Sequence, residues 1–542
     1  MFSRCWRPAG IVLAVLATLG RAATGADWPQ TRAERSTYAE TSTLADVREF
    51  LDQLVAQGAP IVVRPIGTSA GGRPIVAAIV ARPGVTDGKA ARDQGKLVVY
   101  LQANIHGGEV EGKEAVQMLL RDVASDRDGA GRWLDRLVLV VVPVFNVDGN
   151  ETLGDGARIR PSQDGPARVG QRPNGAGLDL NRDAIKIQAP ETRAVVEQVY
   201  RSWDPALMLD LHTTNGTRHG FQLTYSPPLN PNTDRALTGL LSQELLPSVR
   251  TSWRTRSGGD LFDYGNVENR PGARGWYTFG EEGRYVTNYV GLRNRLAILS
   301  EAASFLPFQT RVETTLGFVR AILEQTHERA AAIRTLIDEA DRRTIDWGTH
   351  PENAPALGVR FEFASRGVEP VPLEQLAAGQ AVDHHKAPDP ASLRIEKLPI
   401  YDHFRATRSA RFPSAYVVPP GSEGLLGLLA RHGIQVVRST EPWKGTVDRF
   451  QILEAITRRQ AFQGGTLTRL EGRFVAEPAE LPTGTLLVPT AQPLGRLAFH
   501  LLEPEGLDGA AAWGTLGSLT PPRLFPIAKI GGPLRVRTEP LP

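Results

Sequence analysis

Four short runs of nearly uninterrupted apolar residues stand out along the chain. They are Leu97–Gln102, Leu137–Val144, Ala206–Leu211 and Leu296–Ser300. Strands that alternate apolar and polar residues have one face in water, whereas runs without alternation are typical of parallel strands covered on both faces. Helical patterns such as Val110–Val123 and Pro190–Trp203 separate the runs. The pattern therefore predicts an α/β domain, with a mixed, largely parallel sheet and helices on both faces.

Further patterns flank these runs and extend the predicted domain. Residues Leu44–Gln57 carry apolar side chains at helical spacing, and the strand-like segments Ile61–Ile66 and Pro74–Val80 follow them. The long helical stretch Gln309–Arg343 is expected to close the domain. We therefore predict that residues 27–345 form one domain.

The remainder of the chain predicts a second, smaller α/β domain over residues 358–542. Glycine, proline and polar residues around 346–357 indicate a linker before it. The expected strands and helices are Ala415–Pro419, Gly421–His432, Ile434–Arg438, Leu486–Val488 and Pro493–Leu502. His384 and His385 could bind a metal, but we expect them to be solvated loop residues. No catalytic constellation is apparent in this part of the sequence.

The N-terminus has the pattern of a secretory signal. Arg4 and Arg7 precede the apolar stretch Ile11–Leu19, and small residues lead to a predicted cleavage after Ala26. A retained membrane anchor is the alternative, but the apolar run is short for crossing a bilayer. We therefore expect residues 1–26 to be removed, and the mature protein to be secreted or periplasmic without stable membrane insertion.

Loss of the signal changes what charge and cysteine content imply. The formal net charge is +3, and the signal holds three arginines and no acids, so the mature charge is 0. Binding to nucleic acid is therefore not indicated. The signal also contains Cys5, the single cysteine of the chain. The mature protein can then have neither a disulfide nor a thiolate ligand.

Polar residues follow each of the four apolar runs. His106 and Glu109 come just beyond the first, Asn146 beyond the second, His212 beyond the third and Glu301 beyond the fourth. In open α/β sheets, ligands bind outside the carboxyl ends of the strands. Two histidines and two carboxylates are thus expected at one sheet edge. Imidazole and carboxylate groups suit a catalytic zinc that keeps one position open for water.

Several motifs follow one another in a characteristic order. They are Ile66-Gly67-Thr68-Ser69, Gly72-Arg73-Pro74-Ile75, His106-Gly107-Gly108-Glu109, Pro143 with Asn146-Val147-Asp148-Gly149, Gly177-Leu178-Asp179-Leu180-Asn181-Arg182, His212 and Glu301. In this order and spacing the chain resembles the zinc carboxypeptidases, from about Thr43 to Arg320. Val147 and Asp183 depart from residues common in that family.

The resemblance implies that His106, Glu109 and His212 bind one zinc ion per chain. It also places Asp179 where an acid accepts the second N–H of His106 and fixes the orientation of the ring. Asp210 is a competing candidate for that role, because on an extended segment it points to the same face as His212.

Glu301 matches the catalytic glutamate of the family. In that role it would take a proton from the zinc-activated water and pass it to the leaving amine. Glu111 and Glu114 are nearer to the first motif, but we expect them to be solvated on the following helix.

The resemblance further implies that Asn181 and Arg182 bind the C-terminal carboxylate of the substrate. Arg160 lies closest to the expected position of the arginine that stabilises the oxyanion. Arg158, Arg168 and Arg172 occupy the same segment and compete for that role, or all four are surface charges. The substrate-binding tyrosine is Tyr277, Tyr285 or Tyr289.

The sequence therefore predicts an exported zinc metallocarboxypeptidase that hydrolyses the C-terminal bond of peptides with a free C-terminus. Two alternatives use the same fold: a metal-dependent endopeptidase or amidase acting on cell-wall peptides, and an N-acyl amino acid deacylase. A non-catalytic peptide-binding protein is a more remote alternative, because the predicted ligands and Glu301 are intact.

Overall fold

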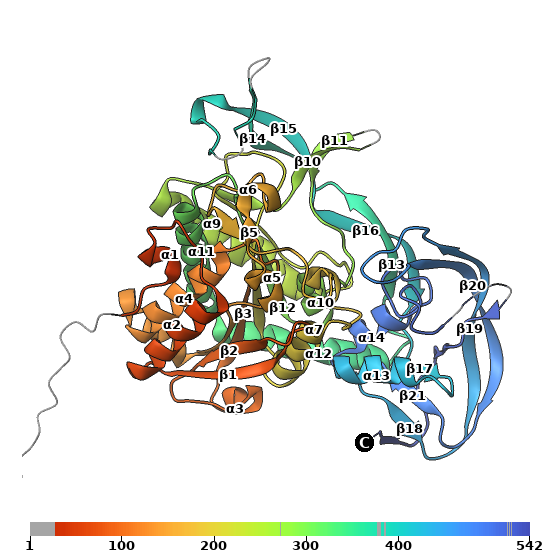
Figure 1. Ribbon diagram of the computed structural model, residues 1–542. Coiled ribbons are helices and arrows are strands. Elements are labelled where there is room, and N and C mark those ends of the chain that lie inside the picture. The colour runs from red at the N-terminus through yellow and green to blue at the C-terminus, as the bar shows by residue number, and fades with distance from the viewer. Residues whose placement is uncertain are drawn as a thin grey trace, which may run out of the picture.

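The computed structural model describes residues 28–270, 273–376, 381–383, 386–517, 519, 521 and 523–541. The predicted signal, 1–26, and the pair His384 and His385 lie outside these residues. Figure 1 shows a large N-terminal α/β region with a smaller C-terminal region beside it. In the described part of the chain, no helix is both long and apolar enough to span a membrane.

One mixed sheet organises the N-terminal region, with strand order β1-β2-β4-β3-β7-β12-β8-β9. Its strands are β1 (Ile61–Thr68), β2 (Pro74–Val80), β3 (Leu97–Ala103), β4 (Leu137–Val142), β7 (Leu207–Thr213), β8 (Leu223–Ser226), β9 (Leu261–Asp263) and β12 (Leu296–Ala302). The central strands β4, β3, β7 and β12 are parallel to one another. On one side β2 is antiparallel to both β4 and β1, and on the other side β8 is antiparallel to β12. Every residue of the four central strands is buried, as their apolar runs predict.

Helices pack against this sheet, as the predicted α/β class requires. They include α2 (Leu44–Ala56), α4 (Glu111–Ala124), α7 (Pro190–Val195) with a π-helical continuation over Val196–Arg201, α9 (Leu246–Ser257), α10 (Val286–Leu292) and α11 (Phe308–Glu328). Helix α12 (Ala330–Thr349) follows α11 and packs on other helices, among them α14 (Gly495–Leu502). The predicted helix 309–343 is in fact two helices, because Arg329 leaves the helical backbone conformation at φ −98° and ψ 12°. Helix α12 also continues into the expected linker, where Gly348 lets it approach the backbone at Thr490 and Ala491 closely.

Residues on both sides of the predicted boundary at 358 build one small sheet. Its strands are β10 (Asn266–Arg270), β11 (Ala273–Tyr277), β15 (Leu393–Tyr401) and β14 (Val368–Glu374), in the order β10-β11-β15-β14. A separate apolar cluster that includes Phe221, Trp276 and Leu398 lies against it. Beside it, β13 (Ala356–Ala364) pairs with β16 (His403–Arg411). This part of the chain is therefore attached to the N-terminal region.

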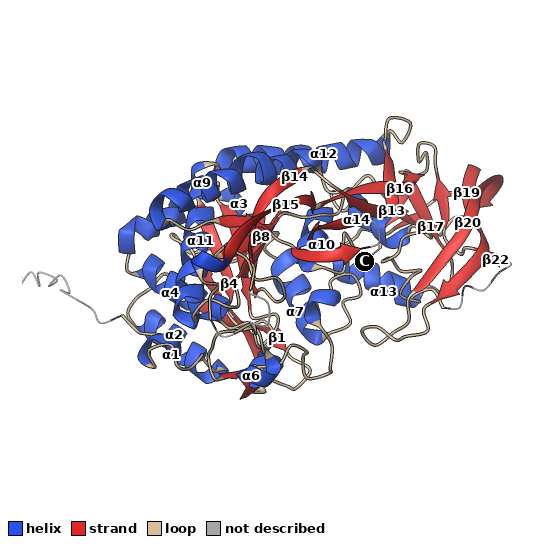
Figure 2. Cartoon of the chain, turned by 90° about the horizontal axis from the view of Figure 1, so that it is seen from above, coloured by secondary structure: helices blue, strands red, loops and turns tan. Residues whose placement is uncertain are grey.

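The C-terminal region is a second sheet, of order β20-β19-β23-β17-β21-β18-β24, in which β22 pairs with β19. Its strands are β17 (Ala415–Val418), β18 (Val437–Ser439), β19 (Trp443–Thr457), β20 (Thr468–Leu481), β21 (Leu486–Pro489), β22 (Arg523–Leu524), β23 (Ala528–Ile530) and β24 (Thr538–Pro540), with helices α13 (Glu423–His432) and α14 (Gly495–Leu502). All of its recorded strand pairs are antiparallel. Figure 2 shows these strands at one end of the molecule and α4, α9 and α11 at the other.

The two regions are joined by a continuous apolar core. One buried cluster contains strand residues such as Val140 and Leu209 together with Leu428 and Leu497 of the C-terminal helices. Arg496 of α14 forms a buried ion pair with Asp234 of the N-terminal region, at 3.0 Å. The C-terminal region is therefore packed firmly on the N-terminal one.

Candidate active site

The predicted site residues meet at the carboxyl ends of the central strands. His106 and Glu109 lie on the segment between β3 and α4, and His212 lies in β7. Glu301 lies in β12, directly opposite His212 in the parallel register. All four are buried. Parallel strands therefore bring together residues that are far apart in the sequence.

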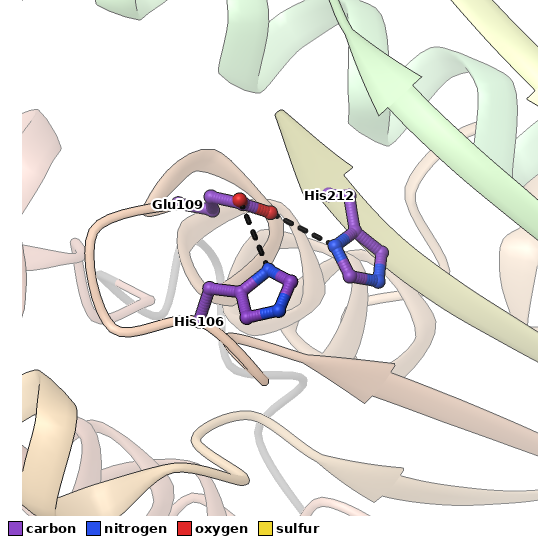
Figure 3. A group of neighbouring side chains, drawn as sticks. All are labelled: His106, Glu109 and His212. Carbon is purple, nitrogen blue, oxygen red and sulfur yellow. Dashed lines mark hydrogen bonds and ion pairs between the residues drawn. The ribbon is translucent and has the colours of Figure 1, made fainter. Parts of the chain in front are cut away.

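Three of these side chains form a compact group (Figure 3). Glu109 Oε1 lies 3.0 Å from His106 Nδ1, and Glu109 Oε2 lies 2.8 Å from His212 Nδ1. Their ligand atoms all lie within 4.8 Å of one another. Burial alone would raise the pKa of Glu109, but His106 and Arg160 hold it well below its usual range. The carboxylate is therefore negative and could hold a cation together with the two imidazoles.

The outer nitrogens of both histidines face carboxylates, which tests whether the group suits zinc. His106 Nε2 lies 3.1 Å from Asp179 Oδ1, and His212 Nε2 lies 2.9 Å from Asp210 Oδ2. In a neutral ring, an acid at Nε2 favours the N–H at that atom and leaves the Nδ1 lone pair toward Glu109. Two such imidazoles and one carboxylate are the donor set of a catalytic zinc site. Asp179 and Asp210 were both candidates for the acid that contacts His106. In the structure Asp179 contacts His106, and Asp210 lies next to His212.

Glu111 and Glu114 are not solvated, contrary to our expectation. Both are fully buried, because α4 is enclosed along almost its whole length. Glu114 accepts hydrogen bonds from the Thr41 hydroxyl and from Ser42, at 2.7–2.9 Å. Glu111 accepts a hydrogen bond from the Thr213 hydroxyl. Their carboxylates are satisfied inside the fold, and neither lines the cavity described next.

A cavity of about 360 Å³ opens beside the histidines. Its walls include Glu301, Asn181 and Arg182, so the structure brings the predicted general base and the predicted carboxylate-binding pair to one space. Glu301 is 8% exposed, and burial raises its pKa to about 8. In the described part of the chain, Arg182 pairs with no carboxylate: it donates to the Asn181 carbonyl at 2.7 Å. Its charge is thus available to an anion in the cavity.

Two of the four candidate arginines line the cavity. The Arg160 guanidinium donates to Glu109 Oε1 at 3.1 Å and to the carbonyls of Thr213 and Thr214 at 3.0 Å. Arg172 donates to Asp179 Oδ2 at 2.9 Å, and its side chain is 43% exposed against 12% for Arg160. The two other candidates, Arg158 and Arg168, are exposed and do not contribute to the wall.

Among the three candidate tyrosines, Tyr285 lines the cavity. The Arg182 guanidinium lies 4.4 Å from the centre of its ring. Tyr289 is fully buried and its hydroxyl contacts His432 at 3.1 Å, while Tyr277 stacks on Tyr401. These contacts engage Tyr289 and Tyr277 elsewhere in the fold.

Sequence reasoning missed two aromatic residues of the wall, Tyr264 and Phe279. Tyr264 follows β9, which has only three residues and therefore leaves no detectable hydrophobic pattern. Phe279 follows β11, whose partner in the small sheet, β15, comes from beyond the predicted domain boundary. Each is an aromatic residue that follows a short strand. This pattern is too common in sequences to identify either residue as part of the site.

A buried metal-ligand group and a buried carboxylate at the edge of a mixed α/β sheet define a metal-dependent hydrolase domain. Residues 47–279 match the zinc carboxypeptidase family, so this part of the chain is a zinc carboxypeptidase domain. The domain is that of a metallocarboxypeptidase-type peptidase, and its family acts on peptides. The matched segment ends before Glu301, which the structure nevertheless places opposite His212.

The relatives found by comparison are carboxypeptidases. The chain is 23% identical to carboxypeptidase 2 of Trichophyton tonsurans over 436 residues, which cover 78% of this chain and 74% of the relative. Carboxypeptidase 2 of Trichophyton rubrum matches with the same identity and shares. Among solved structures, a metallo-carboxypeptidase from Burkholderia cenocepacia superposes with a TM-score of 0.40 and 17% identity, over 54% of this chain and 70% of that one.

Proposed function

We propose that this protein is an exported, zinc-dependent carboxypeptidase that removes the C-terminal residue of peptides. The observation that carries the proposal is the cavity shared by the metal-ligand group, the buried Glu301 and the unpaired cation of Arg182. These groups would act on one scissile bond next to one free carboxylate.

His106, Glu109 and His212 are the residues that would hold the metal. A zinc ion bound there supplies a Lewis acid and lowers the pKa of a bound water. Asp179 contacts His106 Nε2 and would keep that ring in the tautomer that this role needs, and Asp210 Oδ2 lies 2.9 Å from His212 Nε2.

Glu301 is the proposed proton carrier. Its burial favours the neutral acid, and the nearby guanidinium groups of Arg160 and Arg172 favour the carboxylate, because opposite charges stabilise each other. A carboxyl group balanced in this way can accept a proton from the attacking water and return it to the leaving amine near neutral pH. Its position opposite His212 supports this role.

Arg182, Asn181 and Tyr285 would recognise the end of the substrate. A guanidinium can bind a carboxylate through two parallel, charge-assisted hydrogen bonds. The Asn181 side chain is itself held, because its Oδ1 accepts a hydrogen bond from the Val286 N–H at 3.0 Å. The Tyr285 ring packs against Arg182 and fixes the direction of the guanidinium.

Charge that develops on the substrate carbonyl needs a cation, and both Arg160 and Arg172 line the cavity. We assign this role to Arg172 in preference to Arg160. Arg160 is engaged by the Glu109 carboxylate and two main-chain carbonyls, whereas Arg172 is bonded to Asp179 and its side chain is the more exposed of the two. Arg160 would then hold the Glu109 carboxylate in place.

The remaining wall favours an apolar or aromatic C-terminal side chain. Its other residues are uncharged: Ile159, Thr213, Asn215, Tyr264, Phe279, Tyr285, Thr287 and Leu299. The two acids of the described wall, Glu109 and Glu301, already have roles, so a basic side chain would find no free carboxylate. The charged group of a lysine or arginine side chain would lose its hydration in the cavity without gaining an ion pair, which is unfavourable.

The test uses the purified protein and a pool of peptides, each supplied as the free acid and as the C-terminal amide. Mass spectrometry follows the products with zinc present and after chelation. Loss of single apolar C-terminal residues from the acids alone, abolished by chelation, supports the proposal. Internal cleavage or equal attack on amides would reassign the protein as an endopeptidase or amidase. Cleavage restricted to N-acyl amino acids would indicate a deacylase, and no turnover with zinc bound would indicate a binding protein.

Export is the second part of the proposal, and it is supported by the basic, apolar and small residues of segment 1–26. N-terminal sequencing of the protein recovered from the periplasm and the medium tests it. We expect a mature N-terminus at Asp27. A chain that retains residues 1–26 and stays with the membrane would instead support the anchor alternative.

A further inference from the structure

A loop of the C-terminal region contacts the segment that carries the cavity residues Asn181 and Arg182. Residues 458–467 connect β19 and β20, and Gln463 lies in this loop. Gln463 Oε1 accepts a hydrogen bond from the Asp179 N–H at 2.8 Å, and its carbonyl accepts one from Lys186 Nζ at 2.7 Å. The two partners of the first bond are 284 residues apart in the sequence.

The backbone conformation at Gln463 indicates that glutamine is present because its side chain is long enough to contact Asp179. Phe462 and Gly465 exchange both main-chain hydrogen bonds, so Gln463 and Gly464 are the central residues of a two-residue turn. Both have positive φ, 50° and 75°, which is the pattern of a type I′ turn. Such turns strongly favour asparagine before glycine. Glutamine is the less favourable residue for the turn itself, but its longer side chain reaches Asp179.

Asp179 transmits this contact to the metal-ligand group. Its carboxylate contacts His106 Nε2 at 3.1 Å and accepts hydrogen bonds from Arg172 and from the Asn181 N–H. Asn181 and Arg182 follow in the same turn. An anchored backbone at Asp179 therefore fixes one metal ligand and the start of the proposed carboxylate-binding pair.

The C-terminal region also holds the opposite segment of the wall. Asp508 accepts hydrogen bonds from the Arg284 N–H at 2.6 Å and from its guanidinium at 3.2 Å, and the Phe462 ring lies 5.3 Å from that guanidinium. Arg284 directly precedes Tyr285, which lines the cavity. The two contacted segments, 179–182 and 284–286, thus both rest on the C-terminal region.

We infer that Gln463 is a positioning residue of the active site, and that the C-terminal region completes the site by holding Asp179 in place. The catalytic part of this inference rests on the proposed function. Its effect on metal affinity does not, because affinity is measured without a substrate. Groups bonded directly to a metal-ligating histidine change metal affinity or activity about 10- to 100-fold when removed. Gln463 acts one bond further away, so we expect about a 3- to 10-fold effect.

The experiment uses the full chain with Gln463→Asn, Gln463→Ala and the control Gln460→Ala, an exposed glutamine of the same loop. Gln463→Asn suits the turn but is one methylene too short for Asp179, so it separates positioning from folding. We measure melting temperature, zinc affinity by chelator competition, and kcat and KM on a free-acid peptide. We expect Gln463→Asn to melt at or above the wild-type temperature while zinc affinity and kcat/KM fall about 3- to 10-fold. Gln460→Ala is expected to match the wild type.

Wild-type zinc affinity in Gln463→Asn and Gln463→Ala would overturn the inference, whatever the turnover. If the wild type binds zinc but cleaves no peptide, the proposed function fails and the affinity comparison still decides the role of Gln463. If the wild type cleaves peptides and the Gln463 variants equal it in affinity and kcat/KM, the inference about Gln463 fails by itself.

Discussion

The two large sheets of this protein contribute to the candidate site in opposite ways. In the N-terminal sheet the central strands are parallel and fully buried, and His106, His212 and Glu301 lie at or just beyond their carboxyl ends. The C-terminal sheet is antiparallel, and its longest strands are partly exposed. It contacts the site through a turn, at Gln463. The proposed reactive groups thus lie at strand ends in the N-terminal region, and a loop of the C-terminal region contacts the segment next to them.

This contrast explains what hydrophobic patterns can locate. A buried parallel strand is an apolar run, and the first polar residue beyond it marks the edge where ligands bind. A hairpin turn is not preceded by such an apolar run. The residues in it reflect the backbone conformation of the turn and the length of side chain that a contact requires.

The largest effect is expected from Glu301→Gln. The amide keeps the size of the side chain but cannot carry the proton, so kcat should fall about 10²- to 10⁴-fold. Steady-state kinetics on a free-acid peptide measures the loss, and zinc content by mass spectrometry serves as the control. Wild-type turnover with zinc retained would refute the proposed role of Glu301.

The second effect separates Arg172 from Arg160. Loss of a group that stabilises an oxyanion costs about 10²- to 10³-fold in kcat. We therefore expect Arg172→Ala to lose kcat to that extent even when saturated with zinc, with a smaller fall in zinc affinity because Asp179 loses a hydrogen bond. Arg160→Ala should mainly weaken zinc binding, because Glu109 loses its partner. The reverse pattern would return the oxyanion role to Arg160, as the sequence alone predicted.

The third effect concerns the substrate carboxylate. Lysine keeps the charge of Arg182 but loses the planar fork. A hydrogen bond to a charged group contributes about 1.5–3 kcal/mol, so Arg182→Lys should lower kcat/KM about 10- to 100-fold, chiefly by raising KM. Zinc content and melting temperature are the controls, since Arg182 is not a proposed metal ligand. A wild-type KM in Arg182→Lys would argue against recognition of a free C-terminus by Arg182.

The smallest effect concerns the pH dependence of stability in the C-terminal region. Burial raises the pKa of Asp508 to about 7, whereas an unfolded aspartate loses its proton near 3.8. The folded state therefore binds this proton more tightly, and its contribution to stability is lost as pH rises from about 4 to above 7. Asp508→Asn does not titrate there, so its melting temperature should fall less between about pH 5 and 8. Parallel melting curves for the two proteins would contradict this account of Asp508.

Most of the N-terminal sheet could be predicted from the sequence, because apolar runs locate its buried strands and polar residues after them locate the strand ends. Sequence reasoning placed β3, β7 and β12 to within a few residues and selected His106, Glu109 and His212 for one place. It could not predict the β19–β20 hairpin, whose apolar residues do not alternate regularly along largely exposed strands.

Burial that depends on tertiary contacts also escaped the sequence. Glu114 has the composition of a solvated helix position, yet Thr41 and Ser42 close over it and satisfy its carboxylate. The choice between Arg160 and Arg172 depends on which guanidinium is already bonded by main-chain carbonyls, and no spacing encodes that.

The contact between Asp179 and Gln463 can form only late in the synthesis of the chain. A ribosome adds about 5–20 residues per second, so the 284 residues between these partners take roughly 15 to 60 s to synthesise. During that interval the growing chain already contains His106 and the residues around Asp179, but not the loop that anchors them. A nascent chain therefore gains its proposed metal ligands long before it gains the loop that contacts Asp179.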